Sequence, residues 1–390
     1  MQHVYIIGSK GIPARYGGYE TFVEKLTEGQ KSLNIKYHVA SRKDNSELSQ
    51  ENDVFEYNGA EVYSIDVPNV GPAQAILYDI KSLEWAIEDA EKNKVQSPIF
   101  YILAARIGFI IGKYAKRIHR LGGKYFINPD GHEWKRAKWS WPVRKYWKFS
   151  ERLMIKNADL VICDNRKIVE YVENEYKKFN PKTTFIAYGT EIGESSLKSQ
   201  DLVVKNWFEK NNIFEKEYYL IVGRFVPENN YETMIKEFMQ SNSKKDLVIV
   251  TNFQQNKFYD SLLKSTKFNQ DPRIKFVGTV YNQDLLRYIR EQAYAYIHGH
   301  EVGGTNPSLL ESLSSTQLNL LIDVGFNKDV AHDAAIYWTK QKGNLASKIK
   351  DADEYSEMKL KKNQQVAINI IKDEYTWDRI NSLYEGLFLK

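Results

Sequence analysis

The chain has 390 residues, of which 42% are apolar, and carries a formal net charge of +5 at pH 7; its mean hydropathy is −0.53. These values are typical of a soluble globular protein, and the length favours two domains over a single core. The longest apolar stretch, 99–112, is interrupted by Arg106 and is shorter than the ~20 residues of a membrane span. The lone cysteine, Cys163, excludes an intrachain disulfide and fits a reducing compartment. No signal-peptide pattern precedes the first predicted strand, so we expect a cytoplasmic protein.

Strands and helices alternate in the first half of the chain. Apolar runs predict strands at 3–7, 37–40, 60–65, 99–103, 124–128, 159–163 and 184–187. Helical patterns lie between them at 19–26, at 73–93, and in a segment that ends near residue 119. This alternation predicts a parallel sheet covered by helices on both faces.

The same rhythm restarts in the second half, after a polar segment at 194–201 that suits a linker. Further strands are predicted at 218–222, 246–250, 274–277, 293–297 and 319–322, and the tail from residue 355 has a helical pattern. The fold class is therefore α/β, with two doubly wound, Rossmann-like domains. Such domains bind ligands at the carboxyl ends of their strands, and we expect the two to face each other across a crevice.

The most informative stretch runs from His300 to Glu311. It follows the predicted strand at 293–297 and leads into a predicted helix that starts at Ser308. Its two glycines let the backbone approach a phosphate closely, and free N–H groups at a helix amino terminus favour an anion. Glu311, about one turn into the helix, can accept hydrogen bonds from a sugar diol. The segment predicts a nucleotide-sugar site; the alternative is an ordinary strand, turn and helix with a solvated glutamate.

A second feature is the basic and aromatic segment at 135–156, with eight Lys or Arg and a single acid, Glu151. Four of the eight tryptophans of the chain lie in or beside it: Trp134, Trp139, Trp141 and Trp147. Three interpretations stay open: contact with an anionic membrane, stacking on nucleic acid, or a surface helix whose aromatic residues face the core. The density of tryptophan favours lipid over nucleic acid, because its amphipathic ring is suited to an interface.

Motifs spread along the chain resemble those of the retaining GT-B glycosyltransferases of glycosyltransferase family 4. They are found at 17–20, 158–164, 186–190, 222–228 and 303–311. Three longer stretches, at 8–20, 130–139 and 298–307, look like those of the bacterial, streptococcal-type β-1,4-rhamnosyltransferases of capsule and cell-wall polysaccharide synthesis.

The resemblance implies the GT-B fold, with an acceptor-binding domain at 1–193 and a donor-binding domain at 194–371. A carboxyl-terminal helix at about 372–390 would pack back onto the first domain. The implied donor is dTDP-β-L-rhamnose, and the implied acceptor is a sugar on undecaprenyl diphosphate. The enzyme would then work at the inner face of the cell membrane, with anionic lipid and without nucleic acid as a partner. A UDP- or GDP-linked donor, or a non-catalytic membrane- or nucleic-acid-binding module, is the alternative.

The resemblance also implies a set of site residues. Donor binding would use Arg224, Gly278, Gly303, Gly304, Thr305, Asn306 and Glu311. The first glycine loop would supply Arg15, Gly17, Gly18 and Glu20. Asp130, His132 and Arg224 are the expected catalytic residues, and Trp139, Trp141, Trp147 and Lys145 the expected membrane contacts.

Two departures from the family pattern affect the donor site. The first glutamate of the Glu-x7-Glu motif is Gly303 here, and Glu301 lies two residues out of register. The lysine expected about five residues after Arg224 is Asn229. Arg224 is thus the cation of this loop, and its planar fork suits phosphate oxygens.

The expected chemistry needs neither a metal nor a cofactor. Arg224 and the backbone N–H groups at 304–306 would stabilise the departing diphosphate. Asp130 follows a strand end and would accept the proton of the acceptor hydroxyl or fix that sugar; a plain Pro-Asp-Gly turn is the alternative. Asp351 and Asp353 form an Asp-x-Asp sequence that we interpret as solvated surface. A nicotinamide enzyme is disfavoured, because Gly8-Ser-Lys-Gly11 lacks the Gly-x-Gly-x-x-Gly pattern.

Overall fold

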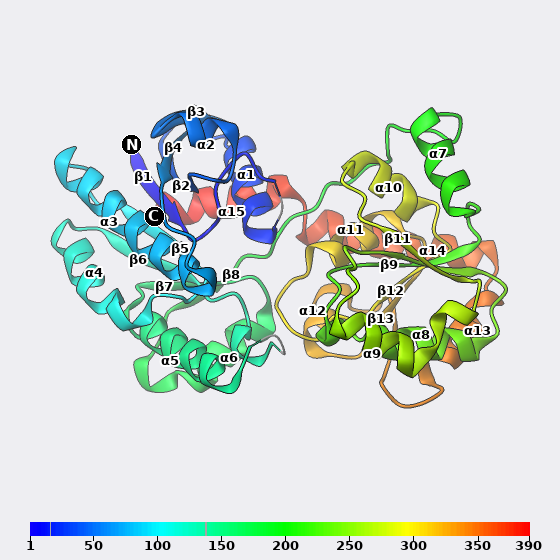
Figure 1. Cartoon of the computed structure of the whole chain (residues 1–390). Coiled ribbons are helices and arrows are strands. Elements are labelled where there is room, and N and C mark those ends of the chain that lie inside the picture. The colour runs from blue at the N-terminus through cyan, green and yellow to red at the C-terminus, as the bar shows by residue number, and fades with distance from the viewer. Residues whose placement is uncertain (16, 137–138) are drawn as a thin grey trace. The chain divides into compact units, whose positions relative to one another are not determined.

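The structure, a computed structural model, describes residues 1–15, 17–136 and 139–390 (Figure 1). These residues form two compact units. Residues 1–189 and 377–390 make up the first unit, and residues 190–376 the second. The unit boundaries thus fall after Gly189 and after Thr376, where the sequence had suggested residues 193 and 371.

The first unit is built on an eight-stranded sheet with the order β3-β4-β2-β1-β5-β6-β7-β8. The strands are β1 (Gln2–Ile7), β2 (Ile35–Arg42), β3 (Val54–Tyr57), β4 (Ala60–Ile65), β5 (Ile99–Leu103), β6 (Lys124–Asn128), β7 (Leu160–Cys163) and β8 (Thr183–Phe185). The pair of β3 with β4 is antiparallel, and the other pairs in this part of the structure are parallel. β5 is buried along its whole length, as expected for a central parallel strand.

Helices cover this sheet, and the last one comes from the end of the chain. They are α1 (Gly18–Glu28), α2 (Glu47–Glu51), α3 (Gln74–Lys92), α4 (Gly108–Arg120), α5 (Trp141–Asn157), α6 (Arg166–Glu175) and α15 (Trp377–Phe388), with short 3₁₀ turns at Gly71–Ala73, Glu133–Lys135 and Lys177–Phe179. The Tyr384 hydroxyl of α15 lies 3.0 Å from that of Tyr101 on β5. Glu385 accepts hydrogen bonds from the backbone N–H groups of Lys31 and Ser32. The carboxyl terminus is therefore an integral part of the first unit.

The second unit contains a six-stranded parallel sheet with the order β11-β10-β9-β12-β13-β14. Its strands are β9 (Tyr218–Val222), β10 (Asp246–Val250), β11 (Ile274–Gly278), β12 (Ala295–His298), β13 (Asn319–Ile322) and β14 (Ile336–Trp338). Its helices are α7 (Leu202–Asn211), α8 (Tyr231–Ser241), α9 (Lys257–Thr266), α10 (Gln283–Glu291), α11 (Pro307–Ser315), α12 (Gly325–Ala331), α13 (Asn344–Asp353) and α14 (Glu357–Glu374), with 3₁₀ turns at Pro227–Asn229 and Phe268–Gln270. Apolar clusters of buried side chains lie on both faces of this sheet.

Each sheet has one place where its strand order reverses. In the first unit, β2 and β4 extend to one side of β1, and β5 to β8 extend to the other. In the second unit, β10 and β11 lie on one side of β9, and β12 to β14 lie on the other. Loops that leave such a switch point diverge to opposite faces of the sheet and leave room for a ligand between them. The switch points lie between β1 and β5 and between β9 and β12.

The predicted strands are present, and two observed strands were missed. β3 has only four residues, with exposure that alternates along it, and β14 has three. Both are edge strands, where there is little burial to produce a long apolar run. Among the described residues, no helix is long and apolar enough to cross a membrane.

Candidate active site

Arg224 lies in the loop that follows β9, at the switch point of the second unit. Its side chain is exposed, and no ion pair or side-chain hydrogen bond connects it to the described part of the chain. The backbone of this loop is fixed by the Asn229 side chain, which donates a 2.7 Å hydrogen bond to the Arg224 carbonyl. Asn229, found where the family has a lysine, is buried and supports the backbone of this loop.

The loop after β9 touches the loop after β12. A Cβ atom on Gly223 would lie 2.7 Å from Cε1 of His300, and one on Gly299 would lie 2.4 Å from the Asn229 carbonyl oxygen. A larger residue at either glycine would push the two loops apart. Arg224 and the segment at 300–311 are therefore parts of one site, as the sequence had suggested for each separately.

The amino terminus of α11 differs from the expectation of free helix donors. The Asn306 side chain accepts hydrogen bonds from the N–H groups of Ser308, at 2.9 Å, and Leu309, at 3.3 Å. Pro307, the first residue of the helix, has no N–H group. The first turn thus satisfies its own donors, so phosphate contacts would come from the preceding loop at 303–306. Gly303 adopts a φ of 135°, which few residues other than glycine can adopt.

Glu311 is held by an arginine that the sequence analysis did not identify. Nη2 of Arg290, on α10, lies 2.5 Å from Oε2 of Glu311, and the two side chains are 4% and 39% exposed, respectively. Arg290 is buried, so the ion pair fixes the glutamate while one carboxylate oxygen stays available to a ligand. The only sequence signal for this arginine was its position beside the apolar residues of an amphipathic helix.

Buried polar groups lie beneath the two loops. The Tyr296 hydroxyl lies 3.1 Å from the Val222 carbonyl oxygen, from Nδ1 of His298 and from the Ser308 hydroxyl. The His298 ring stacks on His300 at 4.4 Å. Burial, assisted by His300, holds the pKa of His298 well below its usual value. His298 is therefore neutral at physiological pH and supports the two loops without adding a positive charge beneath them.

Other residues singled out in the second unit lie beside this site or away from it. Gly278 ends β11 with a φ of 78° and open space around it. Glu301 forms an ion pair with Lys340 at 2.5 Å. Asp353 is not a solvated surface residue as predicted, because it accepts hydrogen bonds from Tyr219 at 2.9 Å and Lys245 at 3.2 Å; Asp351 is exposed.

The first glycine loop lies at the switch point of the first unit, after β1. A Cβ atom on Gly8 would lie 2.1 Å from the Leu103 carbonyl oxygen, so this position needs glycine. Glu20, placed by the resemblance in a ligand loop, is buried and accepts a 2.7 Å hydrogen bond from the Lys10 N–H. It braces the loop. Arg15 is exposed and donates to the Asn45 carbonyl at 3.2 Å.

Gly17 and Gly18 form the junction between this loop and α1. Gly17 caps the helix with a φ of 134°, and Gly18 begins it. A Cβ atom on Gly17 would lie 1.9 Å from the Glu20 carboxylate. The glycine at this position is therefore needed both for its backbone angle and for the bracing glutamate.

Asp130 lies just beyond the carboxyl end of β6, as predicted. Its φ is 56°, and its N–H donates to the Asn128 side chain at 3.0 Å. The Tyr19 hydroxyl lies 3.5 Å from Oδ1 of Asn128 in the same turn, and burial, then the Asp130 charge, raise its pKa. The carboxylate is 32% exposed and lies 3.9 Å from the Arg136 guanidinium, so solvent and a ligand can reach it.

Arg106 is a second site residue that the sequence analysis did not assign. It follows β5 and donates hydrogen bonds to the Gly8 carbonyl at 2.9 Å and to Asp79 at 3.0 Å. Burial raises the pKa of Asp79 to about 6 against the opposing effect of Arg106. The pair connects the loop after β1 to α3. In the sequence, Arg106 was visible only as a charge that interrupts an apolar stretch.

His132 belongs to a buried polar and aromatic cluster. Its ring lies 4.3 Å from that of Tyr171, and the Tyr171 hydroxyl donates to Glu151 at 2.5 Å. Burial, then the charges of Lys135 and Lys148, lower the pKa of His132 to about 4. At physiological pH it is neutral, so any catalytic contribution would be that of an uncharged imidazole.

Much of the segment at 135–156 is engaged within the first unit. Lys148 lies 4.8 Å from the Trp134 and Tyr171 ring centroids and pairs with Glu175 at 2.9 Å. Arg136 forms an ion pair with Glu133, and the Arg144 side chain donates to a backbone carbonyl at 2.9 Å. The membrane contact considered for this segment stays a prediction, and these three cations already have partners within the unit. Lys138, in the same segment, lies outside the described residues.

The expected membrane tryptophans also differ from one another. The Trp139 indole N–H donates to Glu133 at 2.8 Å, and its ring lies 5.8 Å from that of Trp147, which is half-buried. Trp141 is 71% exposed, with Lys145 over its ring at 5.2 Å. Trp141 and Lys145 are therefore the residues of the predicted set that project outward.

One group of side chains in the described structure has metal-ligand geometry: His38, Glu61 and Asp89. Nδ1 of His38 lies 2.9 Å from Glu61, which also pairs with Lys36 at 3.0 Å. Glu61 is the second residue of β4, near the amino ends of the strands. The group therefore lies away from Asp130 and the strand ends where a substrate would bind.

Two family models match the chain, and they meet near the boundary between the units. Residues 1–191 match "Domain of unknown function (DUF1972)", and residues 203–372 match "Glycosyl transferases group 1". A search of the curated proteins finds no match.

Solved structures of similar fold cover nearly the whole chain. Sucrose-phosphate synthase from Thermosynechococcus elongatus has a TM-score of 0.75 at 16% identity, over 100% of both chains. A trehalose-6-phosphate protein from E. coli bound with UDP-2-fluoro glucose has a TM-score of 0.73 at 9% identity, over 100% of this chain and 99% of that one. Anabaena HepE in complex with UDP has a TM-score of 0.71 at 12% identity, over 99% of each.

The fold and the family match lead to the same class of protein. Two parallel-sheet α/β units with these structural neighbours have the GT-B fold, and Arg224, Gly303 and Glu311 all lie inside the region matched at 203–372. The second unit thus carries a group 1 glycosyl transferase domain, and the chain as a whole has the GT-B fold.

Proposed function

We propose that this protein is a retaining glycosyltransferase that moves L-rhamnose from dTDP-β-L-rhamnose to a lipid-diphosphate-linked glucose or N-acetylglucosamine in cell-surface polysaccharide synthesis. One structural observation carries the transfer chemistry. The loops after β9 and β12 touch through Gly223 and His300, so Arg224 and the 303–306 loop lie at one switch point. The choice of rhamnose rests on the motif resemblance at 8–20, 130–139 and 298–307.

In this proposal the nucleoside diphosphate binds along the second unit. Arg224 and the N–H groups of the 303–306 loop contact the phosphates, and the Glu311 carboxylate accepts hydrogen bonds from the sugar ring of the nucleoside. Negative charge grows on the diphosphate as the glycosidic bond breaks, so fixed donors at these positions stabilise the transition state more than the ground state. A metal is not needed for this step.

The acceptor binds in the first unit, at the strand ends near Asp130. The Asp130 carboxylate accepts the hydrogen of the acceptor hydroxyl or holds that sugar in position. His132, being neutral, orients the sugar through hydrogen bonds. The leaving group departs from the same face that the acceptor hydroxyl attacks, so the anomeric configuration is retained and no covalent nucleophile is required.

A UDP- or GDP-linked donor is the second candidate. The E. coli and Anabaena neighbours were solved with a uridine nucleotide, which favours UDP among the alternatives. The ribose contact proposed for Glu311 needs modification for dTDP, because a deoxyribose lacks the 2′-hydroxyl and leaves only the 3′-hydroxyl to this carboxylate. Nucleotide preference is therefore the first quantity to measure.

The acceptor in this proposal stays in the membrane, so the enzyme works at the inner membrane surface as a peripheral protein. The partners are then the nucleotide sugar, the undecaprenyl-diphosphate-linked acceptor and anionic lipid.

The test combines nucleotide binding with product analysis. Thermal shifts are measured with dTDP, UDP and GDP, where a ligand at 100 times its Kd adds about 2.7 kcal/mol of stability. Transfer from each nucleotide sugar to a short-chain lipid-diphosphate acceptor is followed by mass spectrometry, and the one-bond C1–H1 coupling of the product gives its anomeric configuration. Stabilisation by dTDP and a retained rhamnoside support the proposal. Transfer only from a UDP sugar selects the second candidate, and an inverted product contradicts the mechanism.

A further inference from the structure

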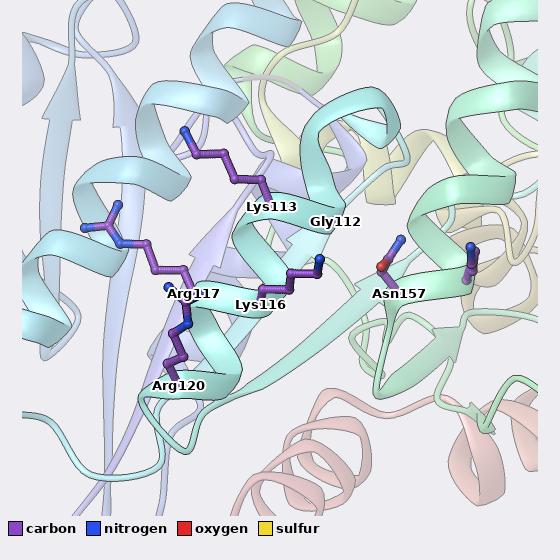
Figure 2. A pocket seen from close by; sticks show the side chains of 7 residues that line it. Gly112, Lys113, Lys116, Arg117, Arg120 and Asn157 are labelled. Atoms are coloured by element: carbon purple, nitrogen blue, oxygen red, sulfur yellow. The ribbon is translucent and has the colours of Figure 1, made fainter.

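The outer surface of the first unit carries a basic cavity between α4 and α5 (Figure 2). Its volume is about 630 Å³, and five of its seven lining residues are cations: Lys113, Lys116, Arg117, Arg120 and Lys156. Its other two lining residues are Gly112 and Asn157, so no carboxylate lines it. Two small residues let the helices approach each other, because Gly108 packs on the Ser150 backbone and Gly112 faces Asn157.

Most of this positive charge has no acidic partner. Arg117 pairs with Glu91 at 2.5 Å and turns toward α3, where Glu84 and Glu88 also face it. Figure 2 shows Lys116 extending instead toward Asn157 and α5. Lys113, Lys116, Arg120 and Lys156 form no ion pair with the residues that the structure describes. At least four positive charges therefore face solvent around one cavity.

Helix electrostatics accounts for only part of this cluster. Arg120 and Lys156 lie in the last turns of α4 and α5, where a cation stabilises the helix carboxyl terminus. Lys113 and Lys116 lie nearer the middle of α4, outside the range of that effect. Their mutual repulsion disfavours the free protein, and an anionic ligand would relieve it.

Exposed aromatic side chains continue the same helix faces. Phe109, 54% exposed, lies four residues before Lys113 on α4. Trp141 and Phe149, 71% and 51% exposed, share a face of α5 with Lys145, Arg152 and Lys156, at spacings of three or four residues. Several exposed apolar groups that gather on neighbouring helix faces mark a contact with a partner or a membrane more often than single ones do.

We infer that the outer faces of α4 and α5 form a docking surface for an anionic lipid bilayer, with headgroup phosphates in the cavity and the three aromatic side chains at the acyl boundary. A soluble phosphate compound would satisfy the cations but not Phe109, Trp141 and Phe149. A bilayer satisfies both, because cationic and aromatic side chains together suit its interface. The inference rests on the proposed function only where it connects docking to a lipid-linked acceptor.

Co-sedimentation with vesicles of phosphatidylglycerol and phosphatidylcholine, or of phosphatidylcholine alone, tests the surface. We expect binding to the anionic vesicles that weakens with added salt. The double variant Lys113→Glu and Lys116→Glu should partition at least roughly 30-fold less, since each lysine near such a surface contributes about 1 kcal/mol. The matched control, Lys257→Glu and Lys264→Glu on α9, makes the same change in net charge and should bind as the natural protein does.

Equal loss in both double variants would overturn the inference, because total charge and not this surface would then govern binding. Glycerol 3-phosphate is also added as a competitor at the same phosphate concentration as the vesicles. If it abolishes vesicle binding, the cavity is a site for a soluble phosphate and the inference is wrong. A third variant, Phe109→Ser with Phe149→Ser, separates the aromatic contribution. It should weaken vesicle binding without abolishing its salt dependence. Unchanged binding would show that these aromatic side chains do not contact the bilayer.

Enzyme assays separate this inference from the proposed function. The α4 double variant should lose activity on a long-chain acceptor in vesicles and keep its activity on a short-chain, water-soluble acceptor. Absence of transfer to either acceptor by the natural protein would contradict the proposed function and leave the vesicle result standing. Equal loss on both acceptors would show that α4 acts on catalysis and not on docking.

Discussion

The loops at the carboxyl ends of the two sheets have the same topology but differ in how their charges are paired. In the second unit, the Arg224 side chain is exposed and without an ion-pair partner in the described structure, and backbone donors at 303–306 lie beside it. In the first unit, Arg106 is paired with Asp79, Glu20 with a backbone N–H, and His132 is buried and neutral. One switch point presents an unsatisfied cation, and the other presents polar groups already held in place.

This difference matches the ligands that we propose for the two units. A diphosphate carries about two negative charges, so its site gains from a cation that has no competing carboxylate. A sugar hydroxyl is neutral and is best recognised by fixed hydrogen-bonding groups that cost little to desolvate. In this proposal the same α/β architecture serves either ligand, and the local charge pairing decides between them.

The largest expected effect is at Arg224. Arg224→Ala should lower turnover by about 10²- to 10³-fold, because charge on the leaving diphosphate grows in the transition state. Initial rates at saturating donor measure this, and donor affinity should fall less. Arg224→Lys keeps the charge without the two-point contact and should recover part of the rate. Normal turnover in the alanine variant would show that another cation, such as Arg15, does this work.

Asp130 tests the other side of the comparison. Asp130→Asn should reduce turnover about 100-fold, since a positioned proton acceptor contributes at least that much, while nucleotide affinity stays unchanged. Asp44→Asn, which removes a carboxylate paired with Arg42 in the same unit, is the control and should be close to the natural enzyme. If the Asp130→Asn variant lost nucleotide binding together with turnover, the assignment of Asp130 to the acceptor would be wrong.

Glu311 and Glu301 sharpen the assignment within the donor site. Glu311→Ala should weaken nucleoside diphosphate binding roughly 10- to 100-fold, as expected for a lost hydrogen bond to a charged group. Glu301→Ala removes only an ion pair with Lys340 and should bind nucleotide normally. Because Arg290 would be left buried without its partner, a melting-temperature measurement is needed beside the calorimetry. A folded variant with unchanged affinity would reject the nucleoside contact.

The smallest effect, per pH unit, concerns pH and two of the buried histidines, His132 and His298. The pKa of His132 falls from 6.5 to about 4 on folding, so the unfolded chain binds more protons between these values. Stability contributed by the neutral ring is complete above pH 6.5 and is lost as pH falls toward 4, by at most about 1.4 kcal/mol per pH unit. Denaturant titrations of the natural protein and His132→Gln should show a shallower pH slope in the variant.

Ring nitrogen chemical shifts provide the direct check of that pH prediction. His298, whose pKa burial also lowers, should remain neutral at pH 6, as should His132. A charged ring at either position at pH 6 would show that the prediction of two neutral histidines is wrong.

Much of the fold was readable because buried parallel strands leave continuous apolar runs. The strands predicted at 60–65, 99–103, 124–128, 218–222 and 246–250 have these same bounds in the structure. The glycine loops that hold Gly17 and Gly303 were also identified from the sequence, and both glycines adopt a positive φ. Such features depend on the chain near each residue, and the sequence determined them by itself.

Pairing between distant residues was decided only by the tertiary structure. The attachment of Glu311 to Arg290 and the engagement of Lys148 by Trp134 and Tyr171 depend on how helices pack against one another. The basic segment at 135–156 shows the reason most clearly. A run of charges has the same composition whether its members face solvent or contact other side chains. Only the packing shows that Lys148 is enclosed by Trp134 and Tyr171 while other cations of the segment are exposed.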